Sequence, residues 1–142
     1  MGVRVKILLE IYGKEHEIIA LLNSGYESEE PEIALPKDIA EKLGLWPPKE
    51  FHLDEALTAG GSISVYTLKE KARMKIKLDE RETKPVDCLV VISPTLPEPI
   101  ISDSAIDALN IVVISYKKGL WRHSTDGPDV VRKSAEKVNK SI

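Results

Sequence analysis

Three consecutive turn-forming residues, Asn23, Ser24 and Gly25, directly follow an apolar run that ends at Leu22. A side-chain amide and a hydroxyl both donate and accept hydrogen bonds, and glycine permits a sharp backbone, so this loop can hold and orient a polar group. The amide does not accept a proton at useful pH, so the loop as written carries no general base. Taken alone, the tripeptide is most typical of a plain turn.

A second candidate is the glycine pair Gly60-Gly61, which lies between strand-like stretches at residues 51–58 and 62–68. This pattern predicts a β-hairpin, and it fits an ordinary turn as well as a mobile cover over a cleft. A third candidate is the proline-rich loop at residues 94–99, which leads into an apolar pair and a short helical pattern. None of the three segments indicates a fold or a function by itself, but their order along the chain is more specific than any one of them.

In this order the segments resemble those of the retropepsin-like aspartic proteases, in particular the cellular and archaeal members. The similar segments are the apolar strand and loop at 20–25, the helix at 35–45, the glycine-tipped hairpin at 59–65, and the loop, strand and helix at 94–97 and 99–111. In that family the first segment contains Asp-Ser/Thr-Gly, the second contains Leu-Pro…Leu-Gly-Leu, and the third is the flap that closes over substrate. The resemblance covers residues 1–122.

The resemblance implies an all-β fold, a closed acid-protease barrel with one or two short helices that pairs as a two-fold homodimer. Each chain then supplies one loop, and two loops meet at the two-fold axis, where paired carboxylates share a proton and activate water against a peptide bond. The implied partners are a second copy of the chain and an extended peptide or unfolded protein, with no cofactor. The implied site residues are Asn23 at the Asp position, Ser24 and Gly25 beside it, and Tyr26, Gly60, Gly61, Ser62 and Ile63 in contact with substrate.

The chain departs from the family's pattern at four positions. Asn23 stands where the family has aspartate, and a homodimer then lacks both carboxylates, so we expect loss of nearly all chemistry. Tyr26 stands where a small residue is usual, so its ring is expected to narrow or reshape the substrate pocket. Ser102 replaces a glycine and Asp103 replaces an arginine or similar residue, which puts the packing behind the loop and a supporting ion pair in question.

Three origins of Asn23 are open: a substitution introduced to silence an enzyme, a natural pseudo-protease, or an asparagine that deamidates to aspartate. Three functions are open as well. The chain is an aspartic endopeptidase scaffold that is silent as written, a binding protein that grips an extended strand without cutting it, or a structural or regulatory dimer whose cleft Tyr26 closes. Restoring aspartate separates the first from the others, and the openness of the cleft separates the second from the third.

Short strands and two small helices must position these residues. Alternation of apolar and charged side chains, together with apolar runs of buried-strand length, indicates the strands, while proline, glycine and asparagine mark the helix ends. The predicted strands are 3–11, 17–22, 51–58, 62–68, 72–78, 86–92, 111–116 and 119–122, and the predicted helices are 36–44 and 103–109. We expect one domain over 1–122, then a polar tail or short helix over 123–142 with its helical pattern at 129–140.

The composition is that of a globular protein. Of 142 residues, 42% are hydrophobic and 30% are charged, and the net charge of −3 favours neither nucleic acid nor an anionic membrane. The first 13 residues carry charges within their apolar run, so they predict neither a signal peptide nor a membrane span. The single cysteine, Cys88, suits a cytoplasmic location and is expected in the core, and the three histidines show no metal-ligand spacing, so no metal is expected.

Overall fold

Alternating side chains form the first two strands and begin the core. The computed structural model describes residues 2–137, and in it β1 (Arg4–Ile11) buries every second side chain. Its antiparallel partner is β2 (Lys14–Leu22), joined to it by a turn in which Tyr12 and Gly13 have φ angles of 51° and 76°. Both strands were predicted, and β2 begins three residues earlier than its apolar run because the turn is tight.

The remaining elements follow the apolar runs and the turn residues. The other strands are β3 (Glu32–Leu35), β4 (Phe51–Thr58), β5 (Gly61–Leu68), β6 (Ala72–Ile76), β7 (Val86–Ile92), β8 (Ile100–Ile101), β9 (Ile111–Ser115), β10 (Leu120–His123) and β11 (Arg132–Lys133), and the helices are α1 (Lys37–Lys42) and α2 (Asp103–Ala108). The predicted hairpin, the predicted strand at 86–92 and both predicted helices are confirmed. The strand predicted at 72–78 ends two residues earlier.

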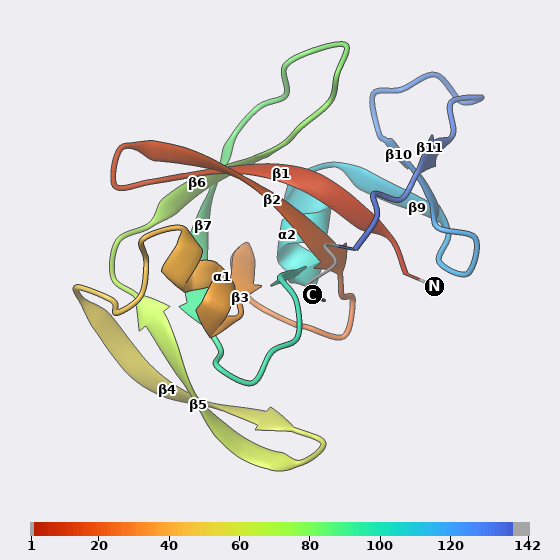
Figure 1. Ribbon diagram of the computed structural model, residues 1–142. Coiled ribbons are helices and arrows are strands. Elements are labelled where there is room, and N and C mark those ends of the chain that lie inside the picture. The colour runs from red at the N-terminus through yellow and green to blue at the C-terminus, as the bar shows by residue number, and fades with distance from the viewer. Residues whose placement is uncertain (1, 138–142) are drawn as a thin grey trace.

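The strands form one eight-stranded and one three-stranded sheet (Figure 1). The order in the larger sheet is β3-β8-β2-β1-β6-β7-β5-β4. The first strand in this order, β3, also pairs in parallel with β7, so the pairings from β3 to β7 form a closed ring. The two-residue β8 runs parallel to β2 and antiparallel to β3, so it joins two strands that are distant from it in sequence. The expectation of a mostly β fold with two short helices is confirmed at this level.

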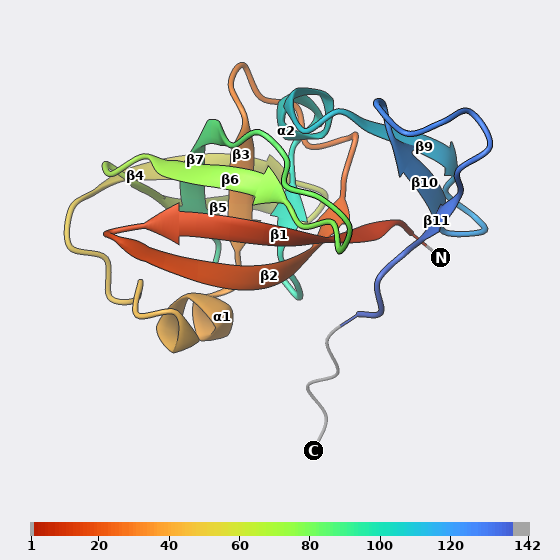
Figure 2. The ribbon, with the colours of Figure 1, turned by 90° about the horizontal axis from the view of Figure 1, so that it is seen from above.

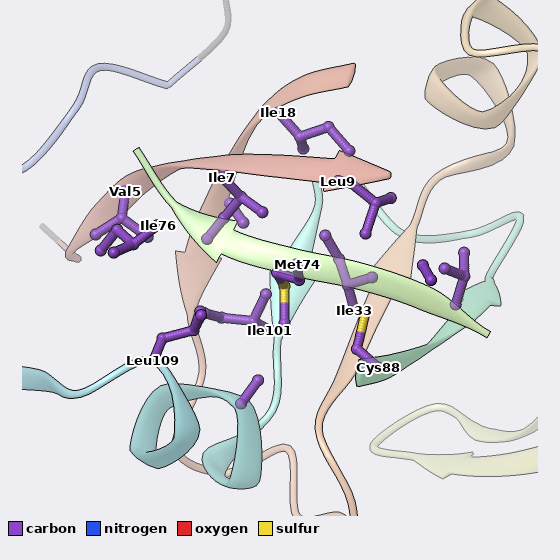
Figure 3. Close-up of a cluster of buried hydrophobic side chains, with 14 of the residues drawn as sticks. Val5, Ile7, Leu9, Ile18, Ile33, Met74, Ile76, Cys88, Ile101 and Leu109 are labelled. Carbon is purple, nitrogen blue, oxygen red and sulfur yellow. The ribbon is translucent and has the colours of Figure 1, made fainter. Parts of the chain in front are cut away.

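Apolar side chains from most strands meet in one buried cluster, part of which Figure 3 shows. Ile7 on β1, Met74 on β6 and Ile101 on β8 have no exposed surface. Cys88 on β7 lies in the same cluster, as its apolar surroundings in the sequence predicted. Burial of β8 between neighbouring strands gives the adjoining loops a rigid base, because a close-packed interior resists displacement.

The helices lie on opposite sides of the strands (Figure 2). Helix α1 follows Pro36, which caps it with a φ of −62°, and is terminated by Gly44 with a φ of 76°. Helix α2 follows Ser102, whose side chain accepts an N–H of the first turn at 3.3 Å, and is terminated by Asn110 with a φ of 59°. Within the described part of the chain, neither helix is long and apolar enough to cross a membrane.

The chain after β10 turns back toward the N-terminal strand (Figure 2). Strand β11 pairs with β10, and the N–H of Ala135 then donates to the carbonyl oxygen of Arg4 at 2.8 Å. The N–H of Arg4 in turn donates to Ser134 Oγ at 2.8 Å. Of the helical pattern predicted at 129–140, residues 129–137 form no helix, and residues 138–140 lie outside the described residues.

Candidate functional site

The loop at residues 23–25 leaves the end of β2 and is shaped by the side chain of its first residue. Asn23 Oδ1 accepts the N–H of Gly25 at 3.0 Å, and the Asn23 carbonyl oxygen accepts the N–H of Tyr26 at 3.0 Å. The N–H of Asn23 donates to the carbonyl oxygen of Ile101 at 3.2 Å, which ties the loop to β8. Asn23 is half-buried, while the two residues after it are exposed. The loop therefore presents a polar edge of defined shape at the protein surface.

Two backbone segments flank the strand that carries this loop. The N–H of Leu22 donates to the carbonyl oxygen of Val3 at 2.9 Å, and the N–H of Leu21 donates to that of Pro99 at 2.9 Å. The first contact comes from the start of the chain, and the second comes from the proline-rich loop at residues 94–99. The start of the chain and the proline-rich loop are far apart in sequence, and both lie against the end of β2, next to Asn23.

An ion pair fastens the proline-rich loop to β1. Arg4 Nε donates to Glu98 Oε1 at 2.7 Å, and Arg4 Nη2 donates to Glu98 Oε2 at 3.0 Å. The two side chains are 16% and 12% exposed. Hydrogen bonding to the guanidinium of Arg4 holds the pKa of the Glu98 carboxyl below its usual range, against the opposing effect of burial. The pair therefore stays ionised and holds the loop in place at neutral pH.

Ser102 and Asp103, behind the loop, both accept hydrogen bonds from backbone N–H groups. Ser102 is completely buried, and its Oγ accepts the N–H of Glu32 at 3.1 Å in addition to capping α2. Asp103 Oδ1 accepts the N–H groups of Ser28 and Ser104 at 3.0 Å and 2.7 Å. Close packing is therefore retained with a serine at 102, and the aspartate at 103 orders the loop after Asn23 through backbone N–H groups.

Tyr26 lies in a second apolar cluster, separate from the main core. The buried members of this cluster are Ala34, Val65 and Val91, and the half-buried ones are Tyr26, Ala56, Ile63, Leu96 and Ile100. The Tyr26 hydroxyl donates to Glu32 Oε1 at 2.6 Å. Burial, and then the hydrogen bond to Glu32, raise the pKa of the Tyr26 phenol far above its usual value. The ring is thus a neutral, hydrogen-bonded filler between β3, β5, β7 and the proline-rich loop.

The hairpin β4–β5 brings one of its predicted contact residues to this cluster. Ile63 lies opposite Ala56 on the face that packs toward Tyr26. Ser62 is directed otherwise, since its Oγ donates to Glu55 Oε2 at 3.3 Å, and Gly60 and Gly61 are exposed at the tip, where Gly61 has a φ of 112°. Of the predicted site residues on the hairpin, Ile63 therefore lies in the same apolar cluster as Tyr26. Gly60, Gly61 and Ser62 are exposed to solvent.

The loop at residues 23–25 offers hydrogen-bond donors and acceptors and contains no titratable side chain. The loop offers an amide and a hydroxyl, and the neighbouring carboxylates of Glu32 and Asp103 already accept hydrogen bonds. Burial raises the pKa of the Cys88 thiol to about 12, so this thiol is not an activated nucleophile. Among residues 2–137, no three His, Cys, Asp or Glu side chains are grouped so as to hold a metal ion.

Several site residues had no signal in the sequence. Glu32 precedes a short apolar stretch, and no residue beside it in the sequence predicted that it accepts the Tyr26 hydroxyl. Ala34, Val91 and Leu96 lie in apolar segments. Only the pairing of β3 with β7 determines which of their side chains face Tyr26 and which face the main core. Comparison of the chain with models of known protein families and with curated proteins found no match.

Proposed function

We propose that this chain is the scaffold of a retropepsin-like aspartic endopeptidase, a two-fold homodimer built to hydrolyse extended peptides, and that it is chemically silent because Asn23 stands at the aspartate position. The observation that carries the proposal is the position of the Asn23–Gly25 loop. It leaves β2 beside the buried β8, and a hairpin packs over the adjoining apolar cluster. A loop, a rigid base and a cover are the parts that such a peptide site requires.

The strand pairings support the closed barrel that the proposal needs. The succession β3-β8-β2-β1-β6-β7 returns to β3, and the hairpin β4–β5 is attached outside this ring through β5 and β7. In a homodimer, two copies of the exposed Ser24 and Gly25 would face each other across the two-fold axis. One chain supplies only half of the polar groups, so the dimer is a condition for function.

The chemistry of the proposed reaction explains why the chain is silent. Two aspartates at the axis would share one proton, the ionised carboxylate would take a proton from the attacking water, and the protonated one would polarise the peptide carbonyl. Two Asn23 amides offer neither form. They carry no charge and hydrogen-bond to each other, so they hold the dimer without hydrolysis.

A second function is favoured by the Tyr26 ring, which fills space next to the hairpin. On this alternative the chain is a natural pseudo-protease that binds extended peptides or serves as a regulatory dimer. On this alternative the ring occupies the space that a peptide side chain would otherwise enter, which also suits a closed dimer.

The test is Asn23→Asp. An aspartate retains the oxygen that accepts the Gly25 N–H, so the loop keeps its shape. We expect the variant to cleave an unfolded protein with an acidic optimum when it is assayed from about pH 3 to pH 8, because one proton must be shared by the pair. We also expect its dimer to weaken as pH rises, because a shared proton has a raised pKa and its stabilisation is lost above that pKa.

Asn23→Ala is the matched control, since it removes the amide without supplying a carboxylate. Dimer constants are measured for all three proteins by analytical ultracentrifugation. A native protein that is only monomeric at micromolar concentration contradicts the homodimer. An Asn23→Asp variant that is a folded dimer but cleaves nothing at any pH contradicts the protease scaffold and favours the binding function.

A further inference from the structure

The space around the Tyr26 ring is built like a binding pocket for a phenol. Its walls are apolar and come from β3, β5, β7 and the proline-rich loop, through Ala34, Ile63, Val65, Val91 and Leu96. The carboxylate of Glu32 contacts the ring's hydroxyl at 2.6 Å. Apolar walls with one convergent polar group are typical of sites that select a ligand by shape and by one hydrogen bond.

Glu32 is positioned independently of Tyr26. Its N–H donates to the buried Ser102 Oγ at 3.1 Å, and its carbonyl oxygen accepts the N–H of Ser102 at 3.1 Å. Strand β3, which starts at Glu32, is held on both sides by β7 and β8. The backbone that carries the acceptor therefore keeps its place when the ring is removed, which favours a pocket that is already shaped for a hydroxyl.

The outer wall of the pocket belongs to the hairpin, which can move without unfolding the body. The register of β5 with β7 consists of two pairs, Tyr66 with Ile92 and Thr67 with Val91, at the base of the hairpin. Beyond this base, Ile63 and Val65 contact the Tyr26 cluster through side chains. Contacts of this kind separate at a lower free energy than a strand ladder, so the ring and the wall are released together.

We infer that Tyr26 is an internal occupant of a pocket that accepts a tyrosine side chain from an extended peptide, and that the peptide binds only after the ring has left. This inference rests on the proposed peptide-binding function. It adds to that function a selectivity for a phenol, supplied by Glu32, and a closed resting state, supplied by Tyr26.

The first experiment tests the pocket without any peptide. Tyr26→Gly is titrated with p-cresol, which is the missing side chain, and with toluene, which lacks the hydroxyl, while thermal unfolding is followed. We expect p-cresol to stabilise the variant and to bind it about tenfold or more tightly than toluene, because a hydrogen bond to a charged group adds roughly 1.5–3 kcal/mol. Adding Glu32→Gln should remove most of this preference.

Two controls make the result specific. Native protein should respond to neither compound, since its pocket is filled. Met74→Ala opens a cavity in the main core, where no carboxylate lies, so it should not prefer p-cresol over toluene. If Tyr26→Gly is unfolded by itself, the same titration is followed as refolding by circular dichroism. Equal responses to both compounds, or no response to p-cresol, overturn the inference.

The second experiment uses a short extended peptide with one tyrosine and the same peptide with serine in its place. We expect Tyr26→Gly to bind the tyrosine peptide at least about tenfold more tightly than native protein does, by the same reasoning on the released pocket. Tyr26→Phe keeps the ring but loses its hydrogen bond to Glu32, so its affinity for the tyrosine peptide should fall between those of native protein and Tyr26→Gly. If p-cresol binds as expected and no variant binds the peptide, the peptide-binding function is wrong although the pocket is present. If peptides bind but ignore tyrosine, the pocket assignment is wrong although the function stands.

Discussion

Removing the charge of Glu98 tests whether the ion pair with Arg4 holds the proline-rich loop beside the Asn23 loop. The pair is two-pronged, with donor–acceptor distances of 2.7 Å and 3.0 Å, and both side chains are largely shielded from water. Lys137 Nζ lies 3.7 Å from Glu98 Oε2, but this lysine is half-exposed and adds little. The perturbation is Glu98→Gln, combined with Arg4→Met in a double-mutant cycle.

The expected coupling is about 2 kcal/mol. Hydrogen bonds between charged groups contribute roughly 1.5–3 kcal/mol each when measured by deletion, and the cost of desolvating both partners offsets part of that sum. The Glu98→Gln variant should therefore lose about 2 kcal/mol of unfolding free energy at pH 7, and much less when Arg4 is already methionine.

The pH dependence follows from the lowered pKa of Glu98. Its carboxyl is more acidic in the folded protein than in the unfolded chain, so the stabilisation is complete above the unfolded value of about 4.3 and is lost as pH falls through the folded value. Urea unfolding of the four proteins at about pH 7 and pH 3 measures both effects. A coupling below about 0.5 kcal/mol, or one unchanged at low pH, refutes the reasoning.

The same variant reports on the site. Pro99 directly follows Glu98, and its carbonyl oxygen accepts the N–H of Leu21 on β2. If the ion pair holds the loop, the Leu21 amide should exchange faster in Glu98→Gln, while amides in the centre of β1–β2 pairing should not change. Unchanged exchange at Leu21 would mean that the loop is held by its prolines alone.

Two further predictions concern the second sheet and the core. Asp126 accepts hydrogen bonds from Arg132, Arg81 and the N–H of His123. Its side chain is 2% exposed, although the residue as a whole is only half-buried. Asp126→Asn should therefore lower the free energy of unfolding by about 2 kcal/mol at neutral pH and lower Tm by roughly 5–8 °C in calorimetry. Hydrogen bonding to Arg132 lowers the Asp126 pKa, so this difference should shrink as pH falls below about 4. The control is Glu82→Gln, which should change stability little because Glu82 is exposed and pairs with Lys75 outside this network. Cys88 has no exposed surface and a pKa of about 12, so a thiol reagent at neutral pH should react with unfolded but not with native protein, and fast reaction of native protein would contradict its burial.

Local patterns in the sequence predicted most elements because each element carries its own signal. Alternation in β1, the glycine pair in the hairpin, and Pro36 with Gly44 around α1 all act within a few residues. The apolar run at 86–92 likewise predicted β7. It did not predict that β3, β5 and β6 would all pair with β7, because a run buried on both faces does not specify its neighbours.

The candidate site was predictable in its loop and not in its pocket. Asn23, Ser24 and Gly25 are turn residues after a strand, and the structure has them there. The hydrogen bond between Tyr26 and Glu32 depends on the pairing of β3 with β7 and β8, so it cannot be predicted from a pattern of neighbouring residues. The helical pattern at 129–137 was outweighed by pairing of β11 with β10, which a weakly amphipathic segment cannot reveal.

The pairing of β2 with β8 closes a long loop of the chain, so we expect it to form late in folding. Leu21 and Leu22 meet Ile100 and Ile101, so the partners are about 80 residues apart in the chain, whereas β1–β2 and β4–β5 are closed by short turns. Entropy of loop closure must be overcome before distant contacts stabilise anything, so the hairpins form early and β8 docks late. Asn23 donates its N–H to Ile101, and its loop therefore acquires its final shape at the end of folding. A chain still emerging from the ribosome, with residues beyond 100 not yet released, has every residue of the loop and its local hydrogen bonds, but it lacks the contact with β8 that fixes the loop to the body.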